Sequence, residues 1–153
     1  MINPSNERPL RLNSGQLIVE QLTTEVMVFD KNRNKAFCLN PTAAFVWNQC
    51  DGQTTIEEIA ARSVGSSVGE LAAETVRFAL ETLWNDGLLE PASFQPEVPA
   101  AITRRSLIQK FGKAAAISLP IVTALAVATP KAHASSGHGH HPPPPPPHRG
   151  PHD

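Results

Sequence analysis

The chain lacks the residue patterns on which most enzyme active sites depend. No histidine precedes residue 133, so a Ser-His-Asp arrangement cannot form in the N-terminal part. A glycine-rich phosphate-binding loop and a Cys-x-x-Cys pair are also missing. The adjacent carboxylates Glu57 and Glu58 are explained by helix capping. We therefore expect no enzymatic activity and no cofactor.

Cysteine is scarce as well, with only Cys38 and Cys50 in 153 residues. Two cysteines are too few for a disulfide framework, and neither belongs to a metal-ligand pair. Both lie in apolar contexts and are interpreted as small core residues, with a disulfide between them left open.

The near-neutral charge of the whole chain conceals two segments of opposite sign. Seven basic and twelve acidic residues precede Pro96, which gives a net charge of −5. From Pro96 onward six basic and two acidic residues give +4. An acidic globular part argues against nucleic acid as the main partner, because phosphate binding needs a basic face.

Alternating apolar residues predict three strands, and helical spacing with capping signals predicts three helices. The strands are expected at 16–22, 25–30 and 35–39, with a hairpin at 30–34. Asn40 and Pro41 predict the start of a short apolar helix that ends at Asp51-Gly52. Further helices are expected at about 55–63, after two overlapping capping boxes at Thr54 and Thr55, and at about 70–85.

The fold class that follows is α+β, a small winged-helix-like domain with a three-stranded antiparallel sheet and three helices. It is expected over 16–92, after a flexible arm at 1–15 that could add an edge strand near 10–12. A linker is expected at 93–102. It is followed by a hydrophobic segment at 103–134, which begins with two arginines, and by a tail at 135–153.

Two short runs in this domain resemble the PqqD family (coenzyme PQQ synthesis protein D). The first reads Leu39, Asn40, Thr42, Ala43, Ala44, Trp47, Asp51 and Gly52, and the second is Leu83-Trp84-Asn85-Asp86-Gly87-Leu88-Leu89. The resemblance covers roughly 10–92. It implies a RiPP recognition element, which is a non-catalytic module for ribosomally made, modified peptides. Such a module binds a precursor (leader) peptide and presents it to a maturation enzyme, usually a radical-SAM protein, in the biosynthesis of a peptide-derived cofactor such as pyrroloquinoline quinone or of a natural product.

The resemblance also implies where a leader peptide binds. The peptide adds as a strand beside an exposed sheet edge and lies against the third helix. Carried onto this chain, the peptide-binding residues are Lys35, Ala36, Phe37, Cys38 and Leu39 on the strand, and Thr75, Arg77, Phe78, Ala79 and Thr82 on the helix. Phe37 and Phe78 could equally be core residues, and Lys35 and Arg77 either attract acidic leader side chains or are solvated. Trp47 and Trp84 are interpreted as core anchors.

An export-like segment follows the linker. Thr103-Arg104-Arg105 resembles the start of a twin-arginine signal, although Leu107 and Ile108 stand where Phe and Leu are usual. An uncharged run of 17 residues, 114–130, is expected to form an apolar helix. Ala132 and Ala134 form a small-x-small cleavage pattern. These features predict a membrane or twin-arginine translocase partner and a cytoplasmic N-terminal domain, with 114–130 either cleaved or kept as an inner-membrane tether.

The tail at 135–153 is rich in histidine and proline and is expected to be disordered. Six consecutive prolines at 142–147 predict an extended polyproline II rod. His138, His140 and His141 could bind a metal ion weakly, but their spacing is not that of a fixed tetrahedral site, and a solubilising tail is the alternative.

Two other functions compete with a peptide-binding chaperone that acts on a separate peptide. In the first, the whole chain is a self-contained precursor whose N-terminal domain recruits the modifying enzyme and whose tail is modified and exported. In the second, the domain is a winged-helix DNA-binding protein, against which the charge of −5 and the lack of a basic recognition helix count.

Overall fold

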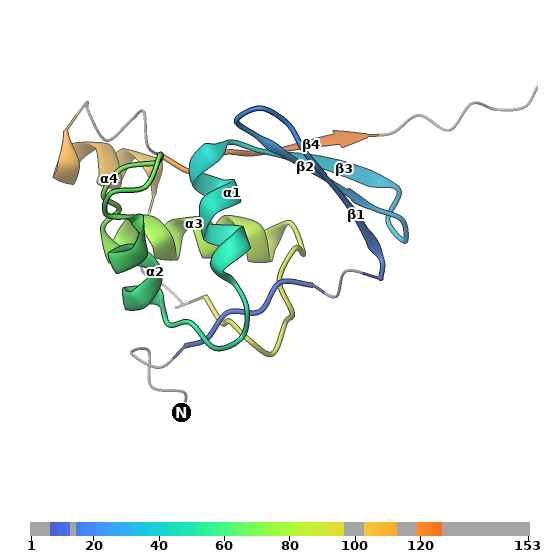
Figure 1. Ribbon diagram of the computed structural model, residues 1–153, viewed down its shortest axis with the longest axis horizontal. Helices are drawn as coiled ribbons and strands as arrows, with labels where there is room; N and C mark the ends of the chain where they lie inside the picture. The colour runs from blue at the N-terminus through green and yellow to red at the C-terminus, as the bar shows by residue number, and fades with distance from the viewer. Residues whose placement is uncertain (1–6, 13–14, 97–102, 113–118, 127–153) are drawn as a thin grey trace, which may run out of the picture.

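The computed structural model describes residues 7–12, 15–96, 103–112 and 119–126. Within them the chain forms an α+β domain with a sheet on one side and helices α1, α2 and α3 on the other (Figure 1). In chain order the elements are β1 (Leu17–Gln21), β2 (Val26–Asp30), β3 (Lys35–Leu39), α1 (Pro41–Gln49), α2 (Ile56–Ser63), α3 (Ala73–Asn85), α4 (Arg104–Phe111) and β4 (Val122–Ala126).

The sheet is antiparallel with the strand order β1-β2-β3-β4. One face turns toward the helices and carries the fully buried side chains of Val26, Val28, Phe37 and Leu39. This alternation is the period of two that the sequence predicted for a half-buried sheet. The β2–β3 turn includes Asn34 at a φ of 50°, a left-handed conformation that asparagine tolerates better than most residues.

The predicted starts of α1 and α2 are confirmed in atomic detail. The Asn40 side chain accepts the amide of Ala43 at 3.0 Å, with Pro41 in the first turn. At α2, Thr55 and Glu58 form a complete capping box. Thr54, the other predicted capping residue, instead donates its hydroxyl to Asp51.

Helix α3 begins three residues later than predicted. Leu71 is buried ahead of the helix, and its amide donates to the Ser63 hydroxyl at the end of α2. The chain passes from α2 through turns at 64–68, this bond holds Leu71 beside the end of α2, and the helix starts at Ala73.

The core lies between the sheet and the three helices. Trp47 is 2 % exposed, as predicted for a core anchor, and its indole N–H donates to the carbonyl of Leu88 at 3.2 Å. Trp84 is half-buried at the edge of the same core. The core continues past the predicted domain end, because Phe94, assigned to the linker, is 1 % exposed.

The described part of the N-terminal arm is bound to the domain. It adds no strand to the sheet, since only isolated bridges join Leu10 to Asp51 and Arg11 to Leu89. Glu7 pairs with Arg77 of α3 at 3.0 Å, and both side chains are mostly buried.

The region expected to contain an apolar helix instead supplies a strand. Residues 122–126 form β4 beside β3, so the sheet has four strands where three were predicted. The sequence reasoning was wrong here because an apolar run pairs as readily with a neighbouring strand as it coils into a helix. Among the residues described, none belongs to a helix long and apolar enough to cross a membrane. Ala132, Ala134, His138, His140 and His141 lie outside the described residues, as does the whole tail.

Candidate functional site

The strand edge that was assigned to a leader peptide is paired with the chain's own β4. The register is antiparallel and continuous, from Lys35 opposite Ala126 to Leu39 opposite Val122. All five predicted strand residues, Lys35 to Leu39, therefore contact a peptide segment, and that segment belongs to the same molecule. A peptide from another molecule could use this edge only after β4 had left it.

Asn40 extends this pairing beyond the end of β3. Its main-chain amide donates to the carbonyl of Ile121 at 3.0 Å. Its side-chain Oδ1 accepts the amide of Ile121 at 2.9 Å, and its Nδ2 donates to the carbonyl of Leu119 at 2.8 Å. The residue that starts α1 thus makes three hydrogen bonds to the main chain of residues 119–121.

The two residues at the start of the segment 119–126 are more deeply buried than β4 itself. Leu119 is 2 % exposed and Pro120 is buried, whereas four of the five β4 residues are exposed. Val122 is half-buried and packs against the domain core. Within residues 119–126, the side chains of Leu119, Pro120 and Val122 are therefore the ones that pack against the domain.

A second contact joins the C-terminal segment to the start of α3. Lys110 of α4 forms an ion pair with Glu74, and this hydrogen bond holds the pKa of the Glu74 carboxyl below its usual range. On the same helix Leu107 is 2 % exposed. Arg104 and Arg105, the predicted export-signal residues, lie in the first turn of α4 and are exposed.

The predicted helix residues of the site have mixed environments. Thr75 and Ala79 are buried, and Phe78 and Thr82 are half-buried. The Thr82 hydroxyl donates to the carbonyl of Phe78 within α3. Arg77 pairs with Glu7 of the N-terminal arm, so its recorded partner is an acidic residue of this domain.

Phe37, for which both a core and a site role were open, belongs to the core at 1 % exposure. The guanidinium of Arg33 lies over its ring, 5.3 Å from the ring centre. Arg33 also pairs with Asp30 at 2.6 Å and donates to the last carbonyls of α3 and its turn, those of Asp86 and Gly87.

Cys38 faces away from the core and is the more accessible of the two free cysteines. Burial, and then a hydrogen bond to Glu25, raise the pKa of its thiol. Burial raises the pKa of Cys50 to about 12. Neither thiol is activated as a nucleophile, since a reactive cysteine has a lowered pKa.

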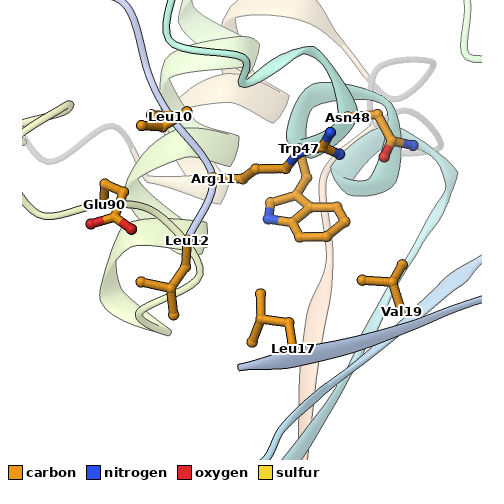
Figure 2. A pocket seen from close by; sticks show the side chains of 8 residues that line it. All are labelled: Leu10, Arg11, Leu12, Leu17, Val19, Trp47, Asn48 and Glu90. Atoms are coloured by element: carbon orange, nitrogen blue, oxygen red, sulfur yellow. The ribbon is translucent and has the colours of Figure 1, made fainter. Parts of the chain in front are cut away.

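An open groove lies at the other margin of the sheet, beside β1. Figure 2 shows the side chains around it, with Arg11 over the ring of Trp47. The groove has a volume of about 480 Å³ and is lined by Leu10, Arg11, Leu12, Leu17, Val19, Trp47, Asn48 and Glu90. No cluster of three metal-ligating side chains occurs in the part of the chain that the structure describes.

The sequence reasoning missed two features here, the hydrogen bonds that Asn40 makes to residues 119–121 and the burial of Leu119 and Pro120. Asn40 was correctly identified as a helix cap, but a cap gives no sign of a partner 79 residues away. The β-branched sequence Ile121-Val122-Thr123 after Pro120 was the available signal for a strand.

Comparison with known proteins gives a match to a family model. A family model described as coenzyme PQQ synthesis protein D (PqqD) matches residues 25–89. That range begins just before β2 and ends after α3, so it contains both β3 and the predicted helix face, while residues 103–126 lie outside it. No curated protein and no solved structure matches the chain. The export signal at 103–134 stays a prediction.

Proposed function

We propose that this chain is a precursor that carries its own peptide-recognition domain. Residues 25–89 act as a PqqD-like recognition element, and residues 103–126 act as the leader that this element holds within the same molecule. The residues after Ala126 are then the segment presented to a maturation enzyme, which we take to be a radical-SAM protein. The domain itself performs no reaction.

The observation that supports this proposal is the pairing of β4 with β3. Strand addition supplies affinity through the main chain, while buried side chains supply the choice of peptide. A leader joined to its domain also has a high effective concentration, because docking is intramolecular. Weak contacts of the exposed β4 residues are then sufficient to keep the edge filled.

A second candidate function is favoured by the match to the PqqD family, whose resemblance implies a separate precursor peptide. In that case β4 is a plug that another peptide displaces from β3. The two candidates differ in what happens to the chain's own C-terminal residues, which are modified in the first and unchanged in the second.

The first experiment tests whether β4 occupies this edge in solution. Thr123 lies opposite Cys38, and directly opposed residues of antiparallel strands are close enough for a disulfide. We expect Thr123→Cys to form an intramolecular disulfide with Cys38 on mild oxidation, detected by mass spectrometry of the monomer. Cys50 is fully buried and should not compete.

The matched control is Ala124→Cys, because residue 124 is next in sequence and turns to the opposite face of the sheet. Equal oxidation of both variants, or no intramolecular bond in either, would overturn the docking of β4. Mass spectrometry of the chain from native cells then separates the candidates. A modified segment after Ala126 supports the precursor, and an unmodified one together with the cross-link supports the displaceable plug.

A further inference from the structure

We infer that Asn40 sets the register of the bound peptide and is therefore a positioning residue of the recognition site. The inference rests on the proposed function, since it describes how the leader is held. It also specifies the class of peptide accepted. The peptide is an extended segment in which Asn40 accepts the amide of the residue at the position of Ile121. An apolar residue lies two positions earlier, as Leu119 does, and a β-branched residue follows directly, as Val122 does.

The geometry explains why an asparagine is needed. The carbonyl of Asn40 accepts the amide of Ala44 in the first turn of α1, so this carbonyl is turned away from the sheet. Side-chain Oδ1 takes over its place in the ladder and accepts the amide of Ile121. Asn40 thereby continues the strand pairing one residue past β3 while its main chain already begins the helix.

The side-chain amide group then adds a contact that other capping residues cannot make. Serine, threonine and aspartate cap helices well through an oxygen, but an ionised aspartate offers no hydrogen and the hydroxyls of serine and threonine are shorter. Nδ2 of Asn40 donates to the carbonyl of Leu119 at 2.8 Å. Because the donor and the acceptor lie on one planar group, Asn40 holds a carbonyl and the amide two residues after it at the same time, and the side chains of the segment decide which residues occupy these two places.

The register places apolar side chains where the segment is most buried. With Ile121 fixed, Leu119 is 2 % exposed and Val122 packs against the core. A slip by one residue would turn each side chain of the strand to the other face of the sheet. Asn40 contacts only main-chain atoms, so it fixes position, while residues 119 and 122 provide the selection between sequences.

The test is hydrogen exchange on the full chain with the variant Asn40→Asp. The new carboxylate keeps an acceptor for Ala43 and Ile121, so α1 stays capped, but it places an oxygen against the carbonyl of Leu119. We expect amides of residues 119–126 to exchange about tenfold faster or more, because a lost donor leaves the carbonyl facing a negative charge. Exchange in α1 should remain within about twofold, as expected when a capping oxygen is retained.

Asn32→Asp is the control, since it makes the same chemical change on an exposed residue of the β2–β3 turn. Lowering the pH provides a rescue that a purely structural role would not show. A protonated carboxyl regains a hydrogen to donate, so the difference between Asn40→Asp and the control should shrink below the pKa of the new group.

Each result has a distinct meaning. Faster exchange confined to residues 119–126 supports the inference. Unchanged exchange there, or an equal loss of protection in α1, overturns it and leaves Asn40 as a helix cap alone. Unprotected amides at 119–126 in the unaltered chain would instead refute the docking of β4, which is the failure of the proposed function.

Discussion

Replacement of Arg33 by alanine should destabilise the domain more than any other change at its exposed turns. The guanidinium pairs with Asp30 at 2.6 Å, donates to the carbonyls of Asp86 and Gly87, and lies over the ring of Phe37. It therefore ties the β2–β3 hairpin to the C-terminal end of α3, more than 50 residues away.

The size of the effect can be estimated contact by contact. Two hydrogen bonds to carbonyls contribute about 1 kcal/mol each to the free energy of unfolding. The partly exposed ion pair adds up to about 1 kcal/mol, and the contact with the ring adds about 0.5 kcal/mol. The main-chain amides of residues 32 and 33 still donate to Asp30 after the substitution, so this carboxylate is not left without partners. The total expected loss is about 3 kcal/mol.

Urea unfolding followed by circular dichroism measures this loss directly as a lower midpoint. Arg33→Lys should recover only about 1 kcal/mol, because an ammonium group is a point charge and cannot make the forked contacts. Lys31→Ala is the control, as an exposed cation in the same turn. A loss below about 0.5 kcal/mol in Arg33→Ala, or full recovery by lysine, would refute the reasoning that the planar group links these two elements.

Two further predictions concern the site and the turn after α1. Leu119→Ala should weaken the docking of residues 119–126 by about 2–4 kcal/mol, because removal of a buried leucine side chain leaves a cavity. Amides of residues 119–126 should exchange faster, while amides of α1, α2 and α3 should not. An equal loss of protection in both would contradict the idea that this segment can leave the domain without unfolding it. Hydrogen bonds from Thr54 and Gln53 lower the pKa of Asp51 to about 2, so its contribution to stability is present above pH 3.8 and is lost as the pH falls toward 2. The urea midpoint of the unaltered chain should therefore fall more steeply between pH 4 and 2 than that of Asp51→Ala, and parallel curves would count against this role.

Local signals in the sequence were sufficient for the type and order of the elements up to residue 89, although α3 starts at Ala73 and not near 70. The predicted strand at 35–39 has the observed bounds, and the caps at Asn40 and Thr55 are confirmed. These features depend on residues within four positions of one another, which is the range over which turns and caps act.

Contacts between distant parts of the chain could not be predicted in this way. Residues 122–126 form a strand beside β3, and the short β-branched run at 121–123 was the one local signal for it, in a segment whose many alanines also suit a helix. The contacts of Arg33 likewise depend on the tertiary structure, which brings the carbonyls of Asp86 and Gly87 next to the β2–β3 hairpin. The strand of the predicted site pairs with β4 of the same chain, whereas the sequence reasoning sought its partner in another molecule.

One oxygen atom of Asn40 accepts hydrogen bonds from two different elements, and this links the start of α1 to the segment before β4. Oδ1 of Asn40 accepts both the amide of Ala43 at the first turn of α1 and the amide of Ile121. Because coupling between two sites is reciprocal, fraying of the helix start and release of the strand change each other by the same free energy, which is small if exchange in α1 stays within about twofold in Asn40→Asp.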